Sequence, residues 1–361
     1  MKQKQFDLSV SSPGRICLFG EHQDYFGLGI IAAAVNLRIT IRGQKRRDRK
    51  FVIDLPDVEG REEFGIDTEI PYDTKRDYLK SGVNVLRRRG IDFYSGWDVI
   101  VRGTIPINAG SASSSALVVA WNQFLLEAGR NAPPHSPEEI AELGYLSEVA
   151  EFKEPGGKMD HFASALGGVV WIQFDEPMKL TRLSNPLQTF VLANSLKKKD
   201  TTGMLGYIKS HVLEGVAQLQ KKFRDFNLKS PLTPEVEKEI DRLPADVRRL
   251  LKGTLLTRDL TRQGAALFQA DEFNHARFGK LLSAQHEVLR HFLQTSTPKI
   301  EQMIEASLAA GALGAKINGS GGGGCMFAYA PENPEKVAEA VEKIGARVYI
   351  VRVDEGVRRE H

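Results

Sequence analysis

Cysteine is scarce in this chain, with only two among 361 residues. Cys17 and Cys325 lie near opposite ends of the chain, each inside a glycine-rich stretch. Two such distant thiols exclude the disulfide framework of a small secreted domain and favour a reducing compartment. We therefore expect a cytoplasmic protein.

Long apolar runs and charge of one sign are missing as well. The first residues, MKQKQFDLSV, lack the apolar core of a signal peptide, and no run approaches the ~20 residues that span a bilayer. The 49 Lys and Arg residues nearly balance the 46 Asp and Glu residues, which leaves a net charge of +3. So small an excess argues against nucleic acid or an anionic membrane as a partner.

What the chain contains is an ordinary globular balance of 42% apolar and 26% charged residues. Its length exceeds the size at which one core usually keeps growing, so it predicts two domains. We place them at 1–190 and 191–361, although no linker or repeat marks the boundary. The most basic run, QKRRDRK at 44–50, lies between two alternating apolar segments and is interpreted as a solvated hairpin turn rather than a binding patch.

Hydrophobic periodicity predicts strands early, helices in the middle and a mixed end. From about residue 200 to 310 the pattern is helical, with breaks near Pro231, Pro244 and Pro298. The end of the chain predicts strand, glycine loop, strand, helix and strand. The other expected strands are 28–42, 50–55, 96–105, 167–174 and 189–195, and the other expected helices are 74–89, 112–128 and 137–152.

Four ionisable side chains crowd the segment PGRICLFGEHQDYFGLG, residues 13–29: Arg15, Glu21, His22 and Asp24. The apolar run IIAAAV follows directly, so these groups lie against a segment built for burial. They could bind a substrate, a metal ion or one another. A metal site made of the last three is disfavoured, because adjacent residues of an extended segment point to opposite faces.

A second segment, TIPINAGSASSSALVVAW at residues 104–121, joins a strand end, a loop of small residues and an apolar helix that begins around Ser113. The backbone N–H groups of such a loop and the positive end of the helix can surround an anion such as phosphate. Helix capping by serine and close packing by glycine and alanine explain the loop alone equally well. Its spacing matches neither the GxxxxGK[ST] phosphate loop nor the GxSxG elbow of a hydrolase.

Glycine is concentrated in a third segment, KINGSGGGGC at residues 316–325. This density between two strands costs conformational entropy, so it requires a close backbone approach by a ligand or by a neighbouring strand, and we favour a ligand. A Pro-Gly-Gly turn in EPGGKMDHFASALGG, residues 154–168, leads into a short helix with Asp160 at its start. Taken alone, such an aspartate is more often a helix cap or a dipole partner than a functional group.

Together the four segments resemble a known family. Residues 13–29 resemble the galactokinase signature PGRVNLIGEHTDYNGG, and PINAGSASSSA resembles the phosphate loop of that family, PxGxGLxSSA. EPGGKMDHFASALGG is similar to its GIMDQ segment, and KINGSGGGGC to its glycine-rich third motif. All four occur in the order of the family, so the chain is identified as a member of the GHMP kinase superfamily, closest to the galactokinases.

The resemblance implies a role for each matching residue. It makes Asp160 the catalytic base and puts Arg15 beside the reacting hydroxyl. Mg²⁺ would bind Glu148, twelve residues before Asp160, and the hydroxyl of Ser114. The implied sugar contacts are Glu21, His22, Asp24, Gly157 and, with a spacing that departs by one, Tyr207; the implied ATP contacts are Asn108, Ala109, Gly110, Ser111, Ala112, Ser113, Ser114, Ser115, Gly321 and Gly322.

The implied fold is α+β with two domains, and ATP and sugar bind between them. The N-terminal domain would resemble ribosomal protein S5 domain 2, with a left-handed βαβ crossover, and the C-terminal domain would be ferredoxin-like. The implied roles agree with physical chemistry, because helix-end amides and Mg²⁺ neutralise the charge that develops in phosphoryl transfer. A positioned carboxylate can also accept the hydroxyl proton, and a neighbouring guanidinium stabilises that carboxylate.

We therefore expect ATP-dependent phosphorylation of a monosaccharide. The expected acceptor is the anomeric hydroxyl of galactose or of a related sugar, and the expected protein is a monomer or weak homodimer. The chain departs from the galactokinase pattern at several positions: Cys17 replaces Asn, Gln23 replaces Thr, Lys158 replaces Ile and His161 replaces Gln. These departures leave room for a different sugar, namely another hexose, a pentose or a uronic acid. Two alternatives stay open. One is a GHMP kinase for mevalonate, homoserine or a heptose phosphate, which the GEHQDY cluster opposes although the third motif does not. The other is a sugar sensor without catalytic activity, against which Arg15, Asp160 and the loop serines argue.

Overall fold

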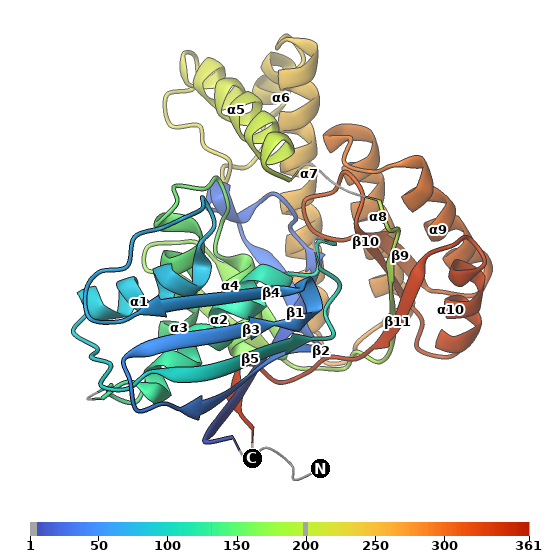
Figure 1. Cartoon of the computed structure of the whole chain (residues 1–361). Coiled ribbons are helices and arrows are strands. Elements are labelled where there is room, and N and C mark those ends of the chain that lie inside the picture. The colour runs from blue at the N-terminus through green and yellow to red at the C-terminus, as the bar shows by residue number, and fades with distance from the viewer. Residues whose placement is uncertain (1–5, 108, 131, 198–200, 361) are drawn as a thin grey trace.

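The computed structural model describes residues 6–107, 109–130, 132–197 and 201–360. They form two lobes, each built on its own sheet, with a group of helices beside them (Figure 1). The expected two-domain α+β class is confirmed. In the described part of the chain no helix is both long enough and apolar enough to cross a membrane.

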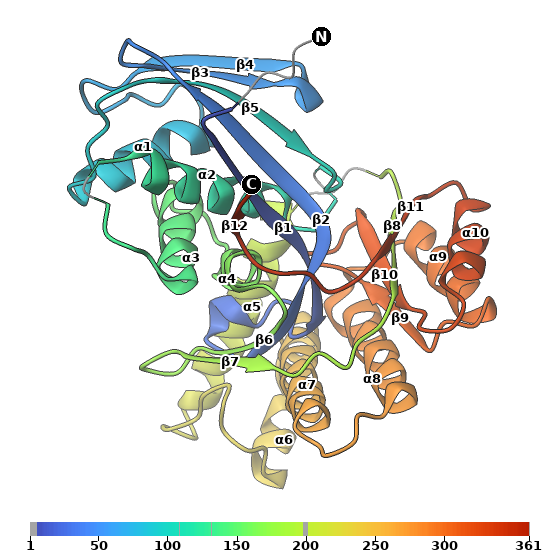
Figure 2. The same cartoon turned by 90° about the horizontal axis from the view of Figure 1, so that it is seen from below.

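The N-terminal lobe is a twisted sheet with helices on one face (Figure 2). Its strands are β1 (Leu8–Phe19), β2 (Ile30–Lys45), β3 (Lys50–Leu55), β4 (Gly60–Gly65), β5 (Trp97–Gly103), β6 (Val169–Gln173), β7 (Lys179–Leu183) and β12 (Arg358–Arg359), and its helices are α1 (Tyr78–Arg88), α2 (Ser113–Ala128), α3 (Pro137–Tyr145) and α4 (Met159–Leu166). The strand order is β12-β1-β2-β5-β3-β4, and β6 and β7 extend from β2. Only the β3–β5 pair is parallel among these described pairs, and α1 lies in the connection between them.

The C-terminal lobe confirms the ferredoxin-like expectation. Its strands are β8 (Phe190–Asn194), β9 (Gly314–Ile317), β10 (Cys325–Tyr329) and β11 (Arg347–Val351), and the helices around them are α8 (His275–Val288), α9 (Pro298–Ala309) and α10 (Pro334–Glu342). The strand order is β11-β8-β10-β9, and every pair is antiparallel. A helical segment follows β8 and α10 follows β10, which gives the βαββαβ order of the ferredoxin-like arrangement.

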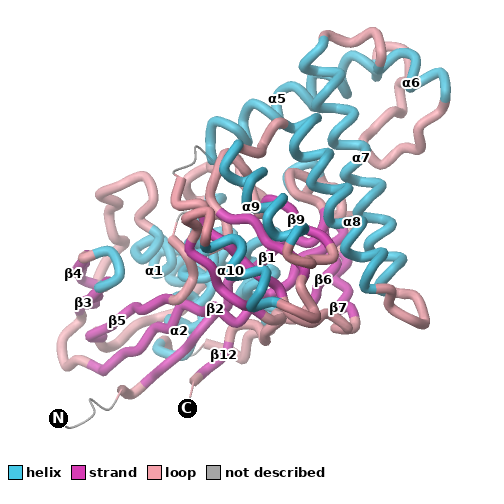
Figure 3. The backbone as a smooth tube through the Cα atoms, turned by 90° about the vertical axis from the view of Figure 1, so that its right-hand side faces the viewer, coloured by secondary structure: helices cyan, strands magenta, loops and turns pink. Residues whose placement is uncertain are grey.

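A group of three helices lies between β8 and α8 in the sequence and projects beyond both sheets (Figure 3). It consists of α5 (Thr201–Gln220), α6 (Pro234–Ile240) and α7 (Ala245–Phe268). The long helix α7 continues into the space between the lobes, where it packs on β1 and β2. The helices therefore join the two lobes as well as extending from them.

The lobes share an apolar core. Phe19 at the end of β1 packs edge-on against Phe278 of α8, with ring centroids 5.9 Å apart, and Phe278 also meets Phe190 of β8. All three side chains are buried. The hydrophobic effect thus favours one fixed arrangement of the lobes rather than two units joined only by a linker.

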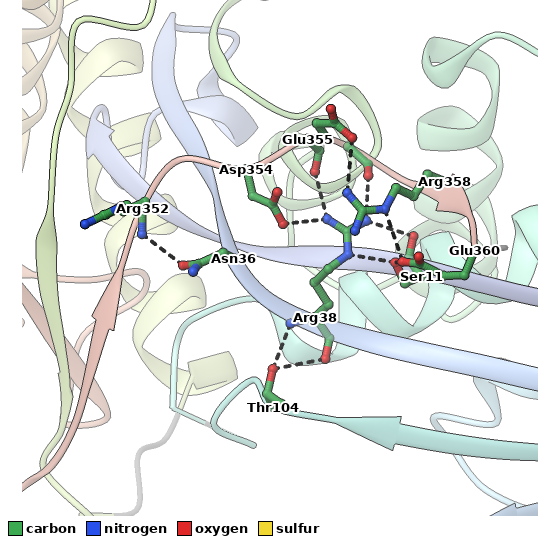
Figure 4. Close-up of polar contacts among 10 residues, drawn as sticks. Ser11, Asn36, Arg38, Thr104, Arg352, Asp354, Glu355, Arg358 and Glu360 are labelled. Atoms are coloured by element: carbon green, nitrogen blue, oxygen red, sulfur yellow. Dashed lines mark hydrogen bonds and ion pairs between the residues drawn. The ribbon is translucent and has the colours of Figure 1, made fainter.

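The last residues of the chain return to the N-terminal lobe. Strand β12 pairs with β1 through Val10 and Arg359. Arg38 of β2 binds this returning segment: its guanidinium donates hydrogen bonds to Asp354 and to the backbone oxygens of Glu355 and Gly356 at 2.7 to 3.0 Å (Figure 4). The first and last strands therefore lie side by side in one sheet.

Two expectations from the sequence were wrong. The run at 44–50 does join two strands, but β2 and β3 do not form a hairpin, because β5 is inserted between them and pairs with both. The helix expected at 137–152 ends at Tyr145 and continues as one π-helical turn, Leu146–Ala150. Such turns widen a helix locally and often occur at functional sites.

Candidate active site

A pocket of about 210 Å³ lies where the sequence motifs meet. Its walls come from the end of β1, the loop before α2, the π-helical turn, the start of α4 and the loop after β9. Of the residues expected at the site, the pocket is lined by Arg15, Glu21, His22, Asp24, Gly110, Ala112, Ser113, Ser114, Ser115, Glu148, Gly157 and Asp160. Segments more than 300 residues apart in the sequence thus form one site.

Arg15 and Asp160 form a two-pronged ion pair at the centre of the pocket. Nε and Nη2 of Arg15 each donate to the Asp160 carboxylate at 2.8 Å, and Nη1 donates to the backbone oxygen of Gly110 at 2.5 Å. Arg15 is buried, whereas the Asp160 side chain keeps 29% of its exposure. Burial by itself would lower the pKa of Arg15, but the charge of Asp160, its hydrogen bonds and other nearby negative groups together outweigh burial and raise that pKa. Arg15 therefore stays charged and holds the carboxylate in one orientation.

Asp24 and Gly157 lie in direct contact in the lining of the pocket. The Asp24 carboxylate accepts backbone hydrogen bonds from Tyr25 at 3.0 Å and from Met159 at 3.2 Å. A Cβ atom on Gly157 would lie 2.0 Å from an oxygen of Asp24, so only glycine fits there. Burial, and then the nearby charge of Asp160, raise the pKa of Asp24.

Glu21 and His22 are fixed by residues of the C-terminal lobe. Glu21 is fully buried and forms an ion pair with Lys316 of β9, while its Oε2 has no hydrogen-bond partner in the described part of the chain. His22 has a left-handed backbone with φ of 62°. Its Nε2 donates to the backbone oxygen of Ser320 at 3.1 Å, so its Nδ1 accepts from the Tyr25 hydroxyl at 2.8 Å.

The loop before α2 presents small residues to the pocket. We call residues 109–115 the serine loop; Asn108 lies outside the described residues. Ala112 has a left-handed backbone with φ of 61° immediately before the helix, which turns the chain into the first residues of α2. Ala109 and Ser111 do not line the pocket. Their backbone oxygens accept hydrogen bonds from the backbone N–H groups of Cys325 and Arg15. The pocket therefore receives the N-terminus of a helix, where an anion is stabilised.

The glycine loop, residues 318–324, packs directly on the serine loop. A Cβ atom on Gly319 would lie 2.8 Å from the Gly110 oxygen, and one on Gly324 would lie 2.5 Å from the Ala109 oxygen. Gly321 and Gly322 do not line the pocket, because they lie against Thr295. A close approach of backbone to backbone thus explains the glycine content, whereas the sequence had favoured a ligand.

Glu148 has the surroundings of a magnesium ligand. It lies on the π-helical turn, and His161 contacts its Oε2 through Nε2 at 2.7 Å. Burial would raise the pKa of Glu148, but hydrogen bonds and charge from His161, followed by the hydroxyls of Ser114 and Ser115, lower it overall. A carboxylate that stays ionised beside a serine hydroxyl fits Mg²⁺, which takes one or two protein oxygens and fills its other positions with phosphate and water. No group of three or more His, Cys, Asp or Glu residues suited to a metal occurs among the described residues.

Several departures from the galactokinase pattern point away from the pocket. Gln23 is buried and donates to the backbone oxygen of Thr254 in α7. Lys158 pairs with Glu142 at 2.7 Å, so its charge is directed away from Asp160. Tyr207 does not line the pocket: it is 43% exposed on α5 and stacks on His211, four residues further along the helix.

The sequence did not single out other residues of the site. Arg76 and Glu154 line the same pocket and form an ion pair at 2.6 Å. Lys316 and Asn318 lie within the glycine-rich motif, but the sequence pattern directed attention to its glycines alone. A lysine in the otherwise apolar strand pattern around it was the signal that could have revealed Lys316, because buried lysines need a partner.

Comparison with known proteins agrees with this geometry. Residues 2–45 match the galactokinase galactose-binding signature, residues 77–168 the GHMP kinases N terminal domain, and residues 265–347 the GHMP kinases C terminal family. A galactokinase of Pasteurella multocida is 30% identical over 95% of this chain and 89% of its own. A mevalonate kinase of Thermococcus sibiricus is 29% identical over 97% of this chain and 98% of its own. The structure of Lactococcus lactis galactokinase complexed with galactose is similar with a TM-score of 0.82 and 22% identity, covering 97% of this chain and 94% of that one.

Fold, pocket and relatives together define the class of the protein: the chain belongs to the GHMP kinase family. Its galactokinase signature forms a wall of the pocket. Within the family, the chain is an ATP-dependent sugar kinase of the galactokinase-like type.

Proposed function

We propose that this enzyme transfers the γ-phosphoryl group of ATP to the anomeric hydroxyl of galactose or of a closely related sugar. One observation carries the proposal: the Arg15–Asp160 ion pair and the carboxylate of Asp24 share a pocket with the N-terminus of α2. Asp160 supplies the base and Arg15 its partner. Asp24 supplies an acceptor for sugar hydroxyls, and the N-terminus of α2 supplies a site for phosphate.

In the proposed mechanism Asp160 accepts the proton of the sugar hydroxyl. Its partly exposed carboxylate can reach a ligand, while Arg15 fixes its orientation through two hydrogen bonds of 2.8 Å. Arg15 also stabilises the developing negative charge on the attacking oxygen, because it remains a buried cation. Proton transfer by a positioned group typically contributes roughly 10² to 10⁴ in rate.

Recognition of the sugar is proposed for Asp24, Glu21 and His22. A buried carboxylate rejects a ligand that lacks a hydroxyl donor, because its oxygen would then stay unpaired. Gln23 and Lys158 depart from the galactokinase pattern, yet their side chains bond elsewhere and leave this wall unchanged. These contacts support galactose over a substrate of unrelated shape.

Phosphate binding is proposed for Gly110, Ala112 and the three serines that follow. Mg²⁺ would be held by Glu148 and Ser114 and would neutralise phosphate charge when bound. The contact from His161 fixes one oxygen of Glu148, which keeps the carboxylate in place. The two buried cysteines are free thiols, which supports the proposal that the enzyme acts in the cytoplasm.

A mevalonate-type substrate is the second candidate, because mevalonate kinases are among the relatives that match almost over their full length. Mevalonate carries a carboxylate of its own. The pocket lining has more carboxylates than guanidinium groups, so a further anion without a cation of its own would be repelled there; the carboxylates are Glu21, Asp24, Glu148, Glu154 and Asp160, and the guanidinium groups are those of Arg15 and Arg76. The charge of the pocket therefore favours a neutral sugar.

The test is a coupled ADP-release assay with MgATP and a panel of monosaccharides, with mevalonate included. We expect turnover of galactose or one close relative well above that of the other compounds. Asp160→Asn should lower kcat by about 10² or more with little change in sugar binding. Asp48→Asn is the matched control, since Asp48 also forms a two-pronged pair, with Arg46, but on the exposed surface. A flat response to all sugars, or an Asp160→Asn variant within threefold of the parent, contradicts the proposal.

A further inference from the structure

Two buried side chains of the C-terminal lobe bind one residue of β1. Nζ of Lys316 donates to the backbone oxygen of Cys17 at 2.9 Å, and the Asn318 side-chain oxygen accepts from the backbone N–H of Cys17 at 2.9 Å. Lys316 and Asn318 are both fully buried. They thus satisfy the two polar backbone groups that Cys17 turns toward the C-terminal lobe, as a neighbouring strand would do.

The same two side chains bind two different segments of the pocket lining. Lys316 forms the buried ion pair with Glu21, in the wall proposed to bind sugar. The amide nitrogen of Asn318 donates to the backbone oxygen of Gly110 at 3.0 Å, in the serine loop. That oxygen also accepts a hydrogen bond from Arg15. The Arg15–Asp160 ion pair and the serine loop are therefore joined at the backbone oxygen of Gly110.

The carboxylate of Glu21 has one hydrogen-bond acceptor left for a ligand. Lys316 binds one oxygen of the carboxylate, and Oε2 is buried without a hydrogen-bond partner in the described part of the chain. Leaving a buried charged acceptor unpaired is costly, roughly 1–3 kcal/mol or more. A hydroxyl donor entering the pocket, which Glu21 lines, would remove that cost.

We propose that Lys316 and Asn318 form a clamp that makes sugar binding and nucleotide binding depend on each other. This inference rests on the proposed function, because it assigns the sugar to the Glu21 part and the nucleotide to the Gly110 part of the pocket lining. A ligand that donates a hydrogen bond to Glu21 acts through Lys316 on the backbone of Cys17, and Cys17 acts through Asn318 on Gly110. Binding of either ligand therefore favours the side-chain positions that the other ligand requires, and the coupling is equal in both directions.

The two residues act as positioning residues, since neither lines the pocket. Removing the Asn318 amide breaks the contact between Cys17 and Gly110 but leaves the Lys316–Glu21 pair in place. Asn318→Ala should therefore reduce the coupling more than it reduces the affinity for sugar alone. Lys316→Met leaves the charge of Glu21 unpaired and should weaken sugar binding itself, whereas Lys316→Arg keeps the charge and should restore part of it.

The experiment is isothermal titration of galactose with and without a non-hydrolysable ATP analogue and Mg²⁺. For the parent protein we expect the analogue to tighten galactose binding at least about fivefold, the lower end of typical coupling. In Asn318→Ala the ratio should fall below about twofold, while the affinity for galactose alone changes less than about threefold. Asn318→Asp, which keeps the acceptor for Cys17 and loses the donor to Gly110, should give the same result if Asn318→Ala folds poorly.

Gln285→Ala is the matched control. Gln285 is also a fully buried amide of the C-terminal lobe, but it donates to Thr257 in α7 and does not line the pocket. It should lower stability and leave the ratio of galactose affinities unchanged. An equal loss of coupling in Gln285→Ala would show that any destabilising change in the C-terminal lobe has this effect. That result would overturn the proposal.

A second readout does not depend on the sugar. Binding of ADP alone should slow amide hydrogen exchange in the segment from Phe19 to Asp24 of the parent protein, and this effect should be absent from Asn318→Ala. Turnover of galactose with independent binding of the two ligands refutes the clamp and leaves the proposed function standing. Absence of turnover with any sugar refutes the proposed function, and the exchange measurement then decides the clamp by itself: no slowing in the parent protein overturns it.

Discussion

Gly157 occupies a place in the pocket that no other residue can fill. A Cβ atom there would lie 2.0 Å from Asp24, which is half-buried and accepts a hydrogen bond from the backbone of Met159. We expect Gly157→Ala to displace Asp24, raise the KM for sugar at least tenfold and cost about 1–3 kcal/mol of stability, the usual cost of overpacking. Steady-state kinetics and denaturant unfolding measure both effects. Gly206→Ala on α5 is the control, because a Cβ atom there meets nothing within 4 Å; equal kinetics in the two variants would contradict this role.

Asp24 should make stability depend on pH. Burial and the charge of Asp160 raise its pKa in the folded protein. Between the unfolded and the raised folded pKa the folded state binds more protons, so the free energy of unfolding falls as the pH rises through that interval and stays lower above it. Asp24→Asn removes this effect. The unfolding midpoint of the variant minus that of the parent should therefore become more positive from about pH 4 to pH 7.

Asp48→Asn provides a control of opposite sign for this measurement. The hydrogen bond from Arg46 lowers the pKa of Asp48, so its stabilising contribution is present above the ordinary pKa of a carboxyl and is lost as the pH falls. The midpoint difference for Asp48→Asn should become more negative as the pH rises. Differential scanning fluorimetry across the range compares the two variants. A pH-independent difference for Asp24→Asn would show that its carboxyl titrates normally.

At the scale of elements, the sequence predicted strands that carry a short run of aromatic and β-branched residues and missed strand β1. Strand β3 lies at 50–55, as expected, because Phe51, Val52 and Ile53 form such a run within six residues. Strand β1 carries Pro13, Gly14 and Arg15 and is buried almost throughout, so no alternation marks it. The hairpin at 44–50 was wrong because the pairing of β5 between β2 and β3 depends on residues about 50 positions away. Motif order, in contrast, identified half of the residues that line the pocket.

Pairs of residues distant in sequence could not be predicted. The pair of Glu21 with Lys316 joins positions 295 residues apart, and nothing near either residue indicates the other. Tyr207, in contrast, was expected at the site and does not line the pocket. Its spacing suggested a sugar contact, but its position on α5 turns the ring toward His211 instead of the pocket.

Arg38 joins β2 to the returning end of the chain and should matter for stability. Its side chain is mostly buried and bonds Ser11, Asp354 and two backbone oxygens (Figure 4). Arg38→Ala leaves these acceptors without a donor, so we expect a loss of about 2–4 kcal/mol in urea unfolding. Arg102→Ala is the control, since Arg102 pairs with Asp57 on the exposed surface and should cost less than about 1 kcal/mol. Similar losses in both variants would contradict this account.

At the scale of the whole molecule, the two lobes depend on each other for their cores. Phe19, Phe190 and Phe278 bury one apolar cluster from both sides, and α7 crosses between the lobes. The clamp adds polar contacts at the same junction. We therefore propose that a cut at residue 190, the boundary expected from the sequence, separates parts that share one core.

The returning segment provides a test of this dependence. A chain truncated after Val351 lacks β12 and exposes the edge of β1, so we expect a clearly lower unfolding temperature. Adding a synthetic peptide of residues 352–361 should restore part of the lost stability, because its contacts with Arg38 and β1 can form between separate chains. Calorimetry with and without the peptide measures both steps. An unchanged unfolding temperature would show that the segment is dispensable.

The pairing of Val10 with Arg359 also means that the first and last strands nearly close the described residues, 6–360, into a ring. A short linker could join its two ends, and the ring could be reopened at the exposed turn 46–49, which contributes nothing to the pocket. The linear order of the four motifs is then one of several orders compatible with the same active site. Circular permutants of this kinase would let a reporter domain be inserted at a chosen point around that ring, without a change to any residue that contacts the ligands.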